Sequence, residues 1–177
     1  MSQKIISIGQ LQKGDVVLST TSDPVSKIVK FATDSKYSHA RIFIGNGNIV
    51  EAIDPKVVTG KLIDVMKGDL YTAVYRYPGL TEMKKLKIIH YANQQLDKEY
   101  DLSGAIGSSR VGMIASPALT ITNLIDSESD FYCSELVAFS YKHAGVRLGF
   151  FSSSTTPKDL AKNKKLEYIG HLKTGQK

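Results

Sequence analysis

Residues 131–145 of the 177-residue chain read FYCSELVAFSYKHAG and contain its only cysteine, Cys133. Asp130 is suited to cap the start of a helix here, and Gly145 suits the left-handed position after a last helical turn. Apolar and small side chains recur at the three- and four-residue spacing of one helix face, at Cys133, Leu136, Val137, Ser140 and Ala144. The pattern therefore predicts a helix with Cys133 in its first turn and on its buried face.

This position of Cys133 has two interpretations. A free cysteine on a buried face is most often a small apolar core residue, and the helix alone favours that interpretation. The unpaired N–H groups and the dipole of a helix start nevertheless favour a thiolate. With a cationic partner added, they lower the pKa of a thiol from about 8.5 toward about 3.5–7.5. The second interpretation therefore requires a histidine nearby.

Length and composition limit what the chain can be. With 42% hydrophobic residues, it is long enough for one domain with a core and too short for two, so we expect a single domain over residues 1–177. One cysteine excludes an internal disulfide, and no CxxC motif or Cys/His cluster indicates a metal site, so neither metal nor cofactor is expected. The first residues lack the apolar run of a signal peptide, and no run reaches the roughly 18 apolar residues of a membrane span. A cytoplasmic location is the default expectation.

The chain is basic, with 23 lysines and arginines against 17 acidic residues and a formal charge of +6. Many of the lysines lie within residues 83–87 and 158–177. Such an excess can attract anionic lipid, so peripheral contact with an anionic membrane is one expectation, although dispersed lysines more often form a solvated surface. No motif of interleaved aromatic and basic residues indicates nucleic-acid binding, and no such partner is expected. The sequence leaves the oligomeric state open.

Residues 37–53, YSHARIFIGNGNIVEAI, give the clearest hairpin signal in the chain. The side chains of a strand alternate between the two faces of a sheet, so the length of the turn decides which residues share a face. A two-residue turn at Asn46 and Gly47 would place His39 and Glu51 on opposite faces. In that register Glu51 has no access to the imidazole.

A three-residue loop at residues 45–47 gives the other register. Arg41 would then lie opposite Glu51, and His39 would share a face with Glu51. Glycine at the third loop position favours this register, because that position needs a left-handed backbone. Glu51 would then be close enough to orient the imidazole, directly or through one water.

Further elements follow from periodicity and turn residues. Strands are expected at residues 16–19, 57–58 and 70–77, with an edge strand at 166–170. Helices are expected at residues 23–35 and 81–96 and from Thr156 onward, with shorter helical or irregular segments at 62–67 and 117–124.

Four histidines are candidate partners for Cys133. His90 lies on or beside the inner stripe of the helix at 81–96 and fits a core or boundary role. His143 is nearly three turns along the cysteine helix, so it cannot reach Cys133 and instead suits the negative end of the helix dipole. His171 lies in the lysine-rich C-terminal segment. His39 is the remaining candidate.

Residues 103–125 carry a single charge, Arg110. One interpretation is a buried connection, and the other is an apolar wall beside the cysteine that holds an acyl chain or an apolar side chain. The two are about equally favoured by the pattern. In the second interpretation Met113 and Ile114 contact the substrate.

The chain resembles the circularly permuted branch of the NlpC-type papain-like superfamily, the YiiX-like proteins related to the lecithin:retinol acyltransferase group. His39 precedes Cys133, whereas ordinary papain-like enzymes have the cysteine first. The matching segments are GDVVLS at 14–19, YSHA at 37–40, IG at 44–45, VEA at 50–52, YD at 100–101 and FYCSELV at 131–137. Together they span most of the chain, and their order and spacing reverse the preference for an inert Cys133.

The resemblance implies an α+β, permuted papain-like fold in which an antiparallel sheet carries the histidine and packs against the cysteine helix. It implies that Cys133 is the nucleophile, that His39 is the general base and acid, and that Glu51 orients and stabilises the imidazolium. The backbone N–H of Cys133 suits an oxyanion donor, because a helix start leaves it unpaired. Tyr37 and Ser38 are candidates for the second donor and for substrate contact.

The implied activity is that of a cysteine-dependent acyl hydrolase or amidase that forms a thioester. Peptide amides fit the superfamily, whereas acyl lipids fit the apolar segment 103–125 and the basic surface. Hydrolysis and acyl transfer both remain open. The alternative is a non-catalytic module that keeps the fold and binds a small ligand in the cleft.

Overall fold

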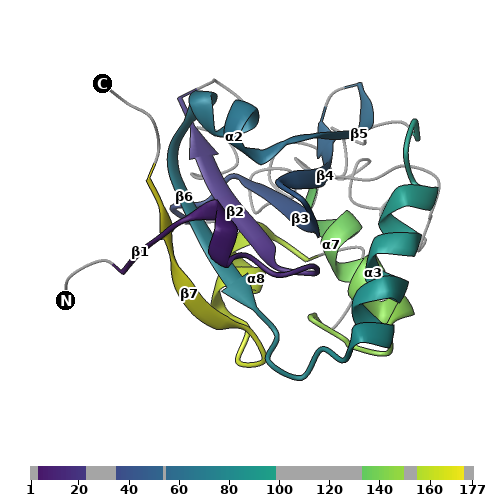
Figure 1. The fold of residues 1–177 in the computed structure, drawn as a ribbon. Coiled ribbons are helices and arrows are strands. Elements are labelled where there is room, and N and C mark those ends of the chain that lie inside the picture. Colours follow the sequence, from purple (N-terminus) through teal and green to yellow (C-terminus); the bar gives the residue numbers. More distant parts are fainter. Residues whose placement is uncertain (1–3, 23–34, 54, 99–132, 150–154, 174–177) are drawn as a thin grey trace, which may run out of the picture.

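A computed structural model describes residues 4–22, 35–53, 55–98, 133–149 and 155–173 (Figure 1). In this part of the chain, seven strands form one sheet in the order β1-β7-β6-β2-β3-β4-β5. All neighbouring pairs are antiparallel except β1 and β7, which are parallel. The strands are β1 (Ile5–Ile6), β2 (Val16–Thr21), β3 (His39–Gly45), β4 (Asn48–Ile53), β5 (Lys56–Lys61), β6 (Asp69–Arg76) and β7 (Glu167–Leu172).

In the described part of the chain, the helices lie beside a single large sheet, as in an α+β fold. Figure 1 shows α3 and α7 beside each other on one side of the sheet, and α7 packs directly on β3 and β4. The elements are η1 (Ile8–Gln10), α2 (Leu62–Val65), η2 (Met66–Gly68), α3 (Glu82–Gln94), α7 (Cys133–His143) and α8 (Pro157–Lys162). Among the described residues, no helix has the length and apolar character needed to cross a membrane.

Each face of the sheet packs on its own apolar cluster, because successive side chains of a strand point to opposite faces. The cluster under α7 includes Leu18, Ala40, Ile42, Val50 and Ala52 from the sheet and Leu136, Val137 and Phe139 from the helix. The cluster on the opposite face includes Val17, Phe43, Ile49, Leu62, Met66, Val74 and Leu172. Alternation along β3 and β4 therefore assigns Arg41 and Glu51 to the face opposite the helix core.

Helix α7 is more deeply buried than its sequence pattern predicts. Every residue from Cys133 to Tyr141 is buried, although the three- and four-residue spacing predicted only one buried stripe. The prediction that Gly145 follows the last turn in a left-handed conformation is confirmed by its φ of 77°. The hydroxyl of Tyr141 donates to the carbonyl oxygen of Gly14 at 2.5 Å, which ties the helix to the loop before β2.

The register of β3 and β4 is the one predicted from glycine at the third loop position, because Arg41 lies opposite Glu51. The predicted three-residue loop is wrong. The turn contains two residues, Asn46 and Gly47, with φ angles of 52° and 73°. A shift in register between Phe43 and Gly45 takes up the extra residue. A short turn and a bulge together therefore give the alignment that a longer loop would have given.

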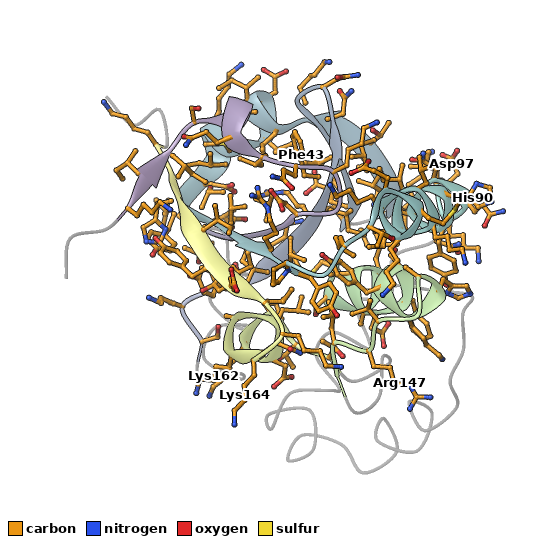
Figure 2. All side chains as sticks on the ribbon, turned by 60° about the horizontal axis from the view of Figure 1, so that its bottom comes forward. Phe43, His90, Asp97, Arg147, Lys162 and Lys164 are labelled. Atoms are coloured by element: carbon orange, nitrogen blue, oxygen red, sulfur yellow. The ribbon has the colours of Figure 1, made fainter. Side chains whose placement is uncertain are left out.

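The inner face predicted for α3 from its periodicity, which included Met83, Leu86 and Ala92, is only partly correct. The buried residues are Ile88, Tyr91 and Ala92, whereas Met83 and Leu86 are 63% and 55% exposed. The helix turns its Ile88–Ala92 side toward α7, where Tyr91 stacks on His143 with ring centroids 3.8 Å apart. His90 is consequently exposed instead of being a core or boundary residue, and it points outward in Figure 2.

Strand β7 is an interior strand and not the predicted edge strand, because it pairs with β6 on one side and with β1 on the other. His171 lies on this strand, buried against Tyr71, and is not part of a solvated tail. The predicted helix start at Thr156 is confirmed, since Thr156 and Asp159 form a reciprocal capping box. The predicted elements at 23–35 and 117–124 lie outside the described residues.

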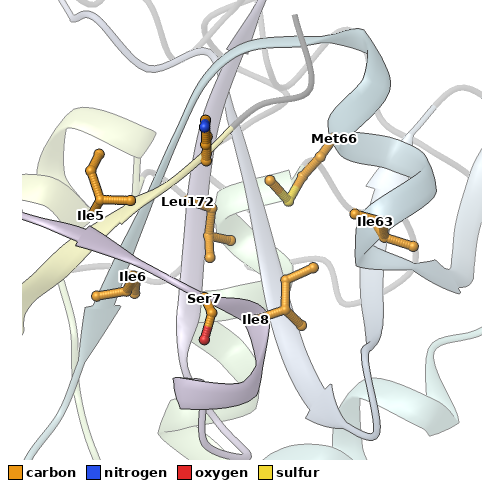
Figure 3. Close-up of a pocket in the computed structure, with 8 residues that line it drawn as sticks. Ile5, Ile6, Ser7, Ile8, Ile63, Met66 and Leu172 are labelled. Carbon is orange, nitrogen blue, oxygen red and sulfur yellow. The ribbon is translucent and has the colours of Figure 1, made fainter.

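An apolar groove of about 490 Å³ lies beside β1 (Figure 3). Ile6, Met66 and Leu172 line it and belong to the cluster on the sheet face opposite α7. The other lining residues are Ile5, Ser7, Ile8, Ile63 and Lys173. The groove is therefore distinct from the surroundings of Cys133 and includes none of the predicted site residues.

Gly170 allows β1 to pack closely against β7. A Cβ atom at Gly170 would lie 2.7 Å from the backbone oxygen of Lys4 and 2.7 Å from a side-chain carbon of Ile6. Because the backbone oxygen cannot move independently of β1, Gly170→Ala should displace the strand and destabilise the protein by about 1–3 kcal/mol. Urea unfolding measures this loss. Gly68→Ala is the control, since a Cβ there meets nothing within 4 Å, and an equal effect of both substitutions would contradict the steric explanation.

Candidate functional site

Cys133 is the first residue of α7 and is 4% exposed. Its side chain hydrogen-bonds His39, and the backbone amides of Ala40 and Ser134 also donate hydrogen bonds to the sulfur. The amide of Ser134 belongs to the helix start, where N–H groups have no partner within the helix. The amide of Ala40 belongs to β3, so the sulfur is held where the helix start meets the start of this strand.

His39 is the first residue of β3, and its side chain is 15% exposed. Its Nε2 atom lies 2.7 Å from Oε2 of Glu51 on β4. Glu51 thus occupies Nε2, which leaves Nδ1 for the thiol of Cys133. The structure therefore brings the three predicted catalytic residues together, with the imidazole between the thiol and the carboxylate.

The charges of this trio reinforce one another. Burial opposes the imidazolium of His39, but the neighbouring Cys133 and the hydrogen bond to Glu51 raise the pKa of His39 to about 9. Burial likewise opposes the thiolate of Cys133, but the charge of His39 and the two backbone amides lower the pKa of Cys133. Between these two pKa values the pair is a thiolate and an imidazolium, the reactive form of a cysteine nucleophile.

Glu51 is 3% exposed and remains ionised. Burial alone would raise its pKa, but His39 and Arg41 outweigh burial and lower the pKa of Glu51 to about 2. The Nε atom of Arg41 donates to Oε2 of Glu51 at 2.7 Å, the same oxygen that contacts His39. One carboxylate oxygen therefore serves two cationic side chains.

Arg41 continues the network away from the thiol. It donates to both carboxylate oxygens of Asp69, at 2.8 and 3.1 Å, and to the hydroxyl of Ser19 at 2.7 Å. Thr72 donates to Asp69 at 2.8 Å. Sequence reasoning gave Arg41 no functional role, although the register already placed it opposite Glu51. Asp69 had no local signal at all, since only the pairing of β2, β3 and β6 brings it to this place.

The backbone amides of Tyr37 and Ser38, predicted as possible oxyanion donors, already have acceptors. The amide of Tyr37 donates to the hydroxyl of Ser35 at 3.0 Å, and that of Ser38 to the carbonyl oxygen of Ser19 at 2.9 Å. The hydroxyl of Tyr37 is buried against that of Tyr75, 3.1 Å away. The second oxyanion donor therefore stays a prediction, and Met113 and Ile114 lie outside the described residues.

The other polar candidates have separate partners. Asp15, a buried carboxylate directly before β2, accepts two hydrogen bonds from Arg76 at 2.7 Å. His143 donates from Nδ1 to the carbonyl oxygen of Phe139 at 3.0 Å, as expected for a residue near a helix C-terminus. No group of three or more His, Cys, Asp or Glu side chains in the described part of the chain is arranged to hold a metal ion.

Comparisons with known proteins concern the family and the fold. The chain is 27% identical to the probable lipoprotein peptidase YaeF of Escherichia coli (strain K12) over 207 aligned positions, which cover 98% of the chain and 75% of the relative. Its fold matches a crystal structure described as that of metalloprotein YiiX from Escherichia coli O157:H7. The TM-score is 0.70 at 22% identity, over 91% of this chain and 97% of the other.

A family model covers more than half of the chain. It is described as "Permuted papain-like amidase enzyme, YaeF/YiiX, C92 family" and matches residues 10–111. This range includes His39, Arg41 and Glu51, and Cys133 follows it, in the order that the permuted topology requires. The chain therefore belongs to the C92 family of permuted papain-like amidases, and its α+β fold is the fold of that family.

Proposed function

We propose that the chain is a cysteine-dependent amidase that hydrolyses a peptide-type amide bond through a thioester on Cys133. The observation that carries the proposal is the position of His39, which hydrogen-bonds the thiol of Cys133 and holds Glu51 at 2.7 Å on its other nitrogen. Membership of an amidase family supports the type of bond. The relative YaeF, named a probable peptidase, supports a peptide-like substrate.

The first half of the reaction acylates the cysteine. The thiolate sulfur of Cys133 attacks the carbonyl carbon of the amide, and the carbonyl oxygen becomes an oxyanion. The backbone N–H of Cys133 at the start of α7 is the proposed donor to that oxyanion. The imidazolium of His39 then gives its proton to the amide nitrogen, the C–N bond breaks, and an amine leaves. A thioester and a neutral imidazole remain.

The second half releases the acid. Neutral His39 takes a proton from water as the water oxygen attacks the thioester carbonyl, and collapse of the intermediate breaks the C–S bond. The products are a carboxylic acid and the regenerated thiolate, with the imidazolium restored. Glu51 keeps its charge throughout, so it holds the ring and offsets the imidazolium without exchanging a proton.

An amide substrate is preferred here to an acyl lipid because the family is one of amidases. The apolar segment 103–125, with Met113 and Ile114, was the main reason to expect a lipid, and it lies outside the described residues. Contact with an anionic membrane, the cytoplasmic location and the non-catalytic alternative stay predictions. Thiol labelling separates the enzyme from the binding module, and paired substrates separate the amide from the ester.

Thiol labelling tests the ion pair. The rate of iodoacetamide labelling of Cys133 should show an inflection well below pH 8.5 in the parent protein. In His39→Ala the inflection should move to pH 8.5 or above, because burial without the imidazolium raises the pKa of a thiol. Limited access to the buried sulfur slows labelling in both proteins but leaves the pH of the inflection unchanged. One common inflection near pH 8.5 would favour the non-catalytic module.

Glu51→Gln tests the third residue. The side-chain amide that replaces the carboxylate still occupies the position beside His39. It carries no charge to stabilise the imidazolium, so kcat should fall by about 10²–10⁴-fold. Asp15→Asn is the matched control, because Asp15 is equally buried but pairs with Arg76. It should retain its kcat, with any loss confined to stability. Retained kcat in Glu51→Gln would show that Glu51 is not the third catalytic residue.

Paired substrates test the bond that is cleaved. Short peptide 4-nitroanilides should be hydrolysed, and rapid quenching with mass spectrometry should find the acyl group on Cys133 of the parent and none on Cys133→Ala. A matched series of acyl p-nitrophenyl esters is assayed below their micelle-forming concentrations. If amides are inert while kcat/KM for the esters rises about fourfold per methylene, equivalent to about 0.8 kcal/mol, the amidase proposal fails and an acyl-lipid substrate is favoured.

A further inference from the structure

Four side chains of alternating charge form a continuous line from the thiol into the protein. His39 contacts Glu51 at 2.7 Å, Glu51 contacts Arg41 at 2.7 Å, and Arg41 contacts Asp69 at 2.8 Å. They come from β3, β4 and β6, so the line crosses the sheet. The proposed mechanism uses only the first two of these residues.

The inner half of the line is almost completely enclosed. The side chains of Arg41 and Asp69 are 5% and 0% exposed. The guanidinium binds Asp69 through two nitrogens, with Ser19 and Thr72 completing the hydrogen bonds around this pair. A two-pronged contact of this kind fixes the plane of the guanidinium, which an ammonium group could not do. The direction of the remaining Nε–H group, toward Glu51, is fixed as a result.

We propose that Arg41, anchored by Asp69, is a positioning residue that holds the Glu51 carboxylate against His39 and sets the balance of charge around the Cys133–His39 pair. The proposal rests on the proposed function, because it assigns Arg41 to the same reaction. Arg41 acts through Glu51, since within the described residues its side chain hydrogen-bonds Glu51, Ser19 and Asp69 and not Cys133.

Two effects of Arg41 can be separated. The first is geometric, since Nε of Arg41 holds the same oxygen that contacts His39 and so prevents the carboxylate from rotating away. The second is electrostatic, since the positive charge of Arg41 opposes the imidazolium and lowers the pKa of His39. Asp69 offsets that charge. Arg41 thus holds the Glu51 carboxylate in place, and the negative charge of Asp69 reduces the destabilisation of the His39 imidazolium by Arg41.

The charged groups around His39 in the described residues come from its own strand, β3, and from three other elements, α7, β4 and β6. Cys133 of α7 and Glu51 of β4 contact the ring directly, and Arg41 of its own strand lies behind Glu51. Asp69 of β6 lies behind Arg41. A change at Arg41 or Asp69 therefore reaches His39 through a defined sequence of charges.

Opposite substitutions give opposite expectations. Arg41→Met removes a cation near the imidazolium, so the pKa of His39 should rise by about one pH unit. Asp69→Asn leaves the charge of Arg41 without its counterion, so the pKa of His39 should fall by a similar amount. Arg41→Lys keeps the charge but loses the two-nitrogen contact with Asp69. The pKa of His39 should therefore stay near that of the parent, while kcat falls roughly 10²-fold because Glu51 is no longer held in place. A purely structural role would not produce shifts of opposite sign.

NMR titration of histidines labelled at Cε1 measures this directly, with the His39 signal assigned by its loss in His39→Ala. The alkaline limb of kcat/KM against pH gives a second measurement on the same variants. Opposite shifts in Arg41→Met and Asp69→Asn support the proposal. Shifts of the same sign, or an unchanged His39 pKa with reduced stability alone, would overturn it and leave Arg41 as a structural residue.

The role of Arg41 can be tested even if a single variant fails to fold or the protein cleaves no amide. If a single variant fails to fold, the double variant Arg41→Met/Asp69→Asn removes both buried charges together, and its His39 pKa should lie between the two single-variant expectations. A His39 pKa in the double variant equal to the value expected for either single variant would contradict the proposal. The NMR titration needs no substrate, so opposite shifts in a protein that cleaves no amide would uphold the role of Arg41 and reject the amidase.

Discussion

The site depends on keeping a carboxylate charged where there is almost no water. Moving an ionised carboxyl group out of water costs several kcal/mol unless cations and hydrogen bonds replace the lost hydration. Glu51 has a cation on each side, His39 and Arg41, both at 2.7 Å from the same oxygen. The need to supply these partners explains why a turn, a bulge and three strands must be aligned before the imidazole has a fixed orientation.

This constraint also explains why the network extends so far into the protein. An arginine buried beside one carboxylate needs further acceptors for its remaining N–H groups, and Asp69 and Ser19 provide them. Asp69 in turn accepts from Thr72. Every charge is thereby matched within hydrogen-bond distance, which is the condition under which buried ion pairs are tolerated. The rigidity of the imidazole is a product of this complete matching.

Local patterns in the sequence predicted the parts of the site that are local. Capping residues and periodicity placed Cys133 in the first turn and on the buried face of a helix, and a glycine in the turn placed His39 and Glu51 on one face. The loop that produced this register was predicted wrongly, because a bulge near Phe43 and Gly45 has no clear sequence signature. Resemblance to a family, and not the residues alone, assigned a reactive role to Cys133.

The remaining errors concern contacts between distant segments. The burial of Tyr91 depends on its stacking with His143 of another helix, so the periodicity of α3 alone selected a face that is only partly correct. His171 is buried because Tyr71, a hundred residues earlier in the sequence and on the neighbouring strand, packs against its ring. Asp69 becomes part of the site only through sheet pairing. Patterns within a short window cannot report such contacts, because the partner lies outside the window.

The order of the segments along the chain has a consequence for when the thiol becomes reactive. His39 and Glu51 belong to adjacent strands joined by a two-residue turn, a contact that forms early because little chain entropy is lost in closing it. Cys133 is separated from them by more than eighty residues of sequence and meets them only when α7 docks on β3 and β4. During synthesis the imidazole and carboxylate are therefore complete before the nucleophile emerges. A chain that ends before Cys133 contains no activated sulfur, and reactivity requires that α7 has docked on β3 and β4.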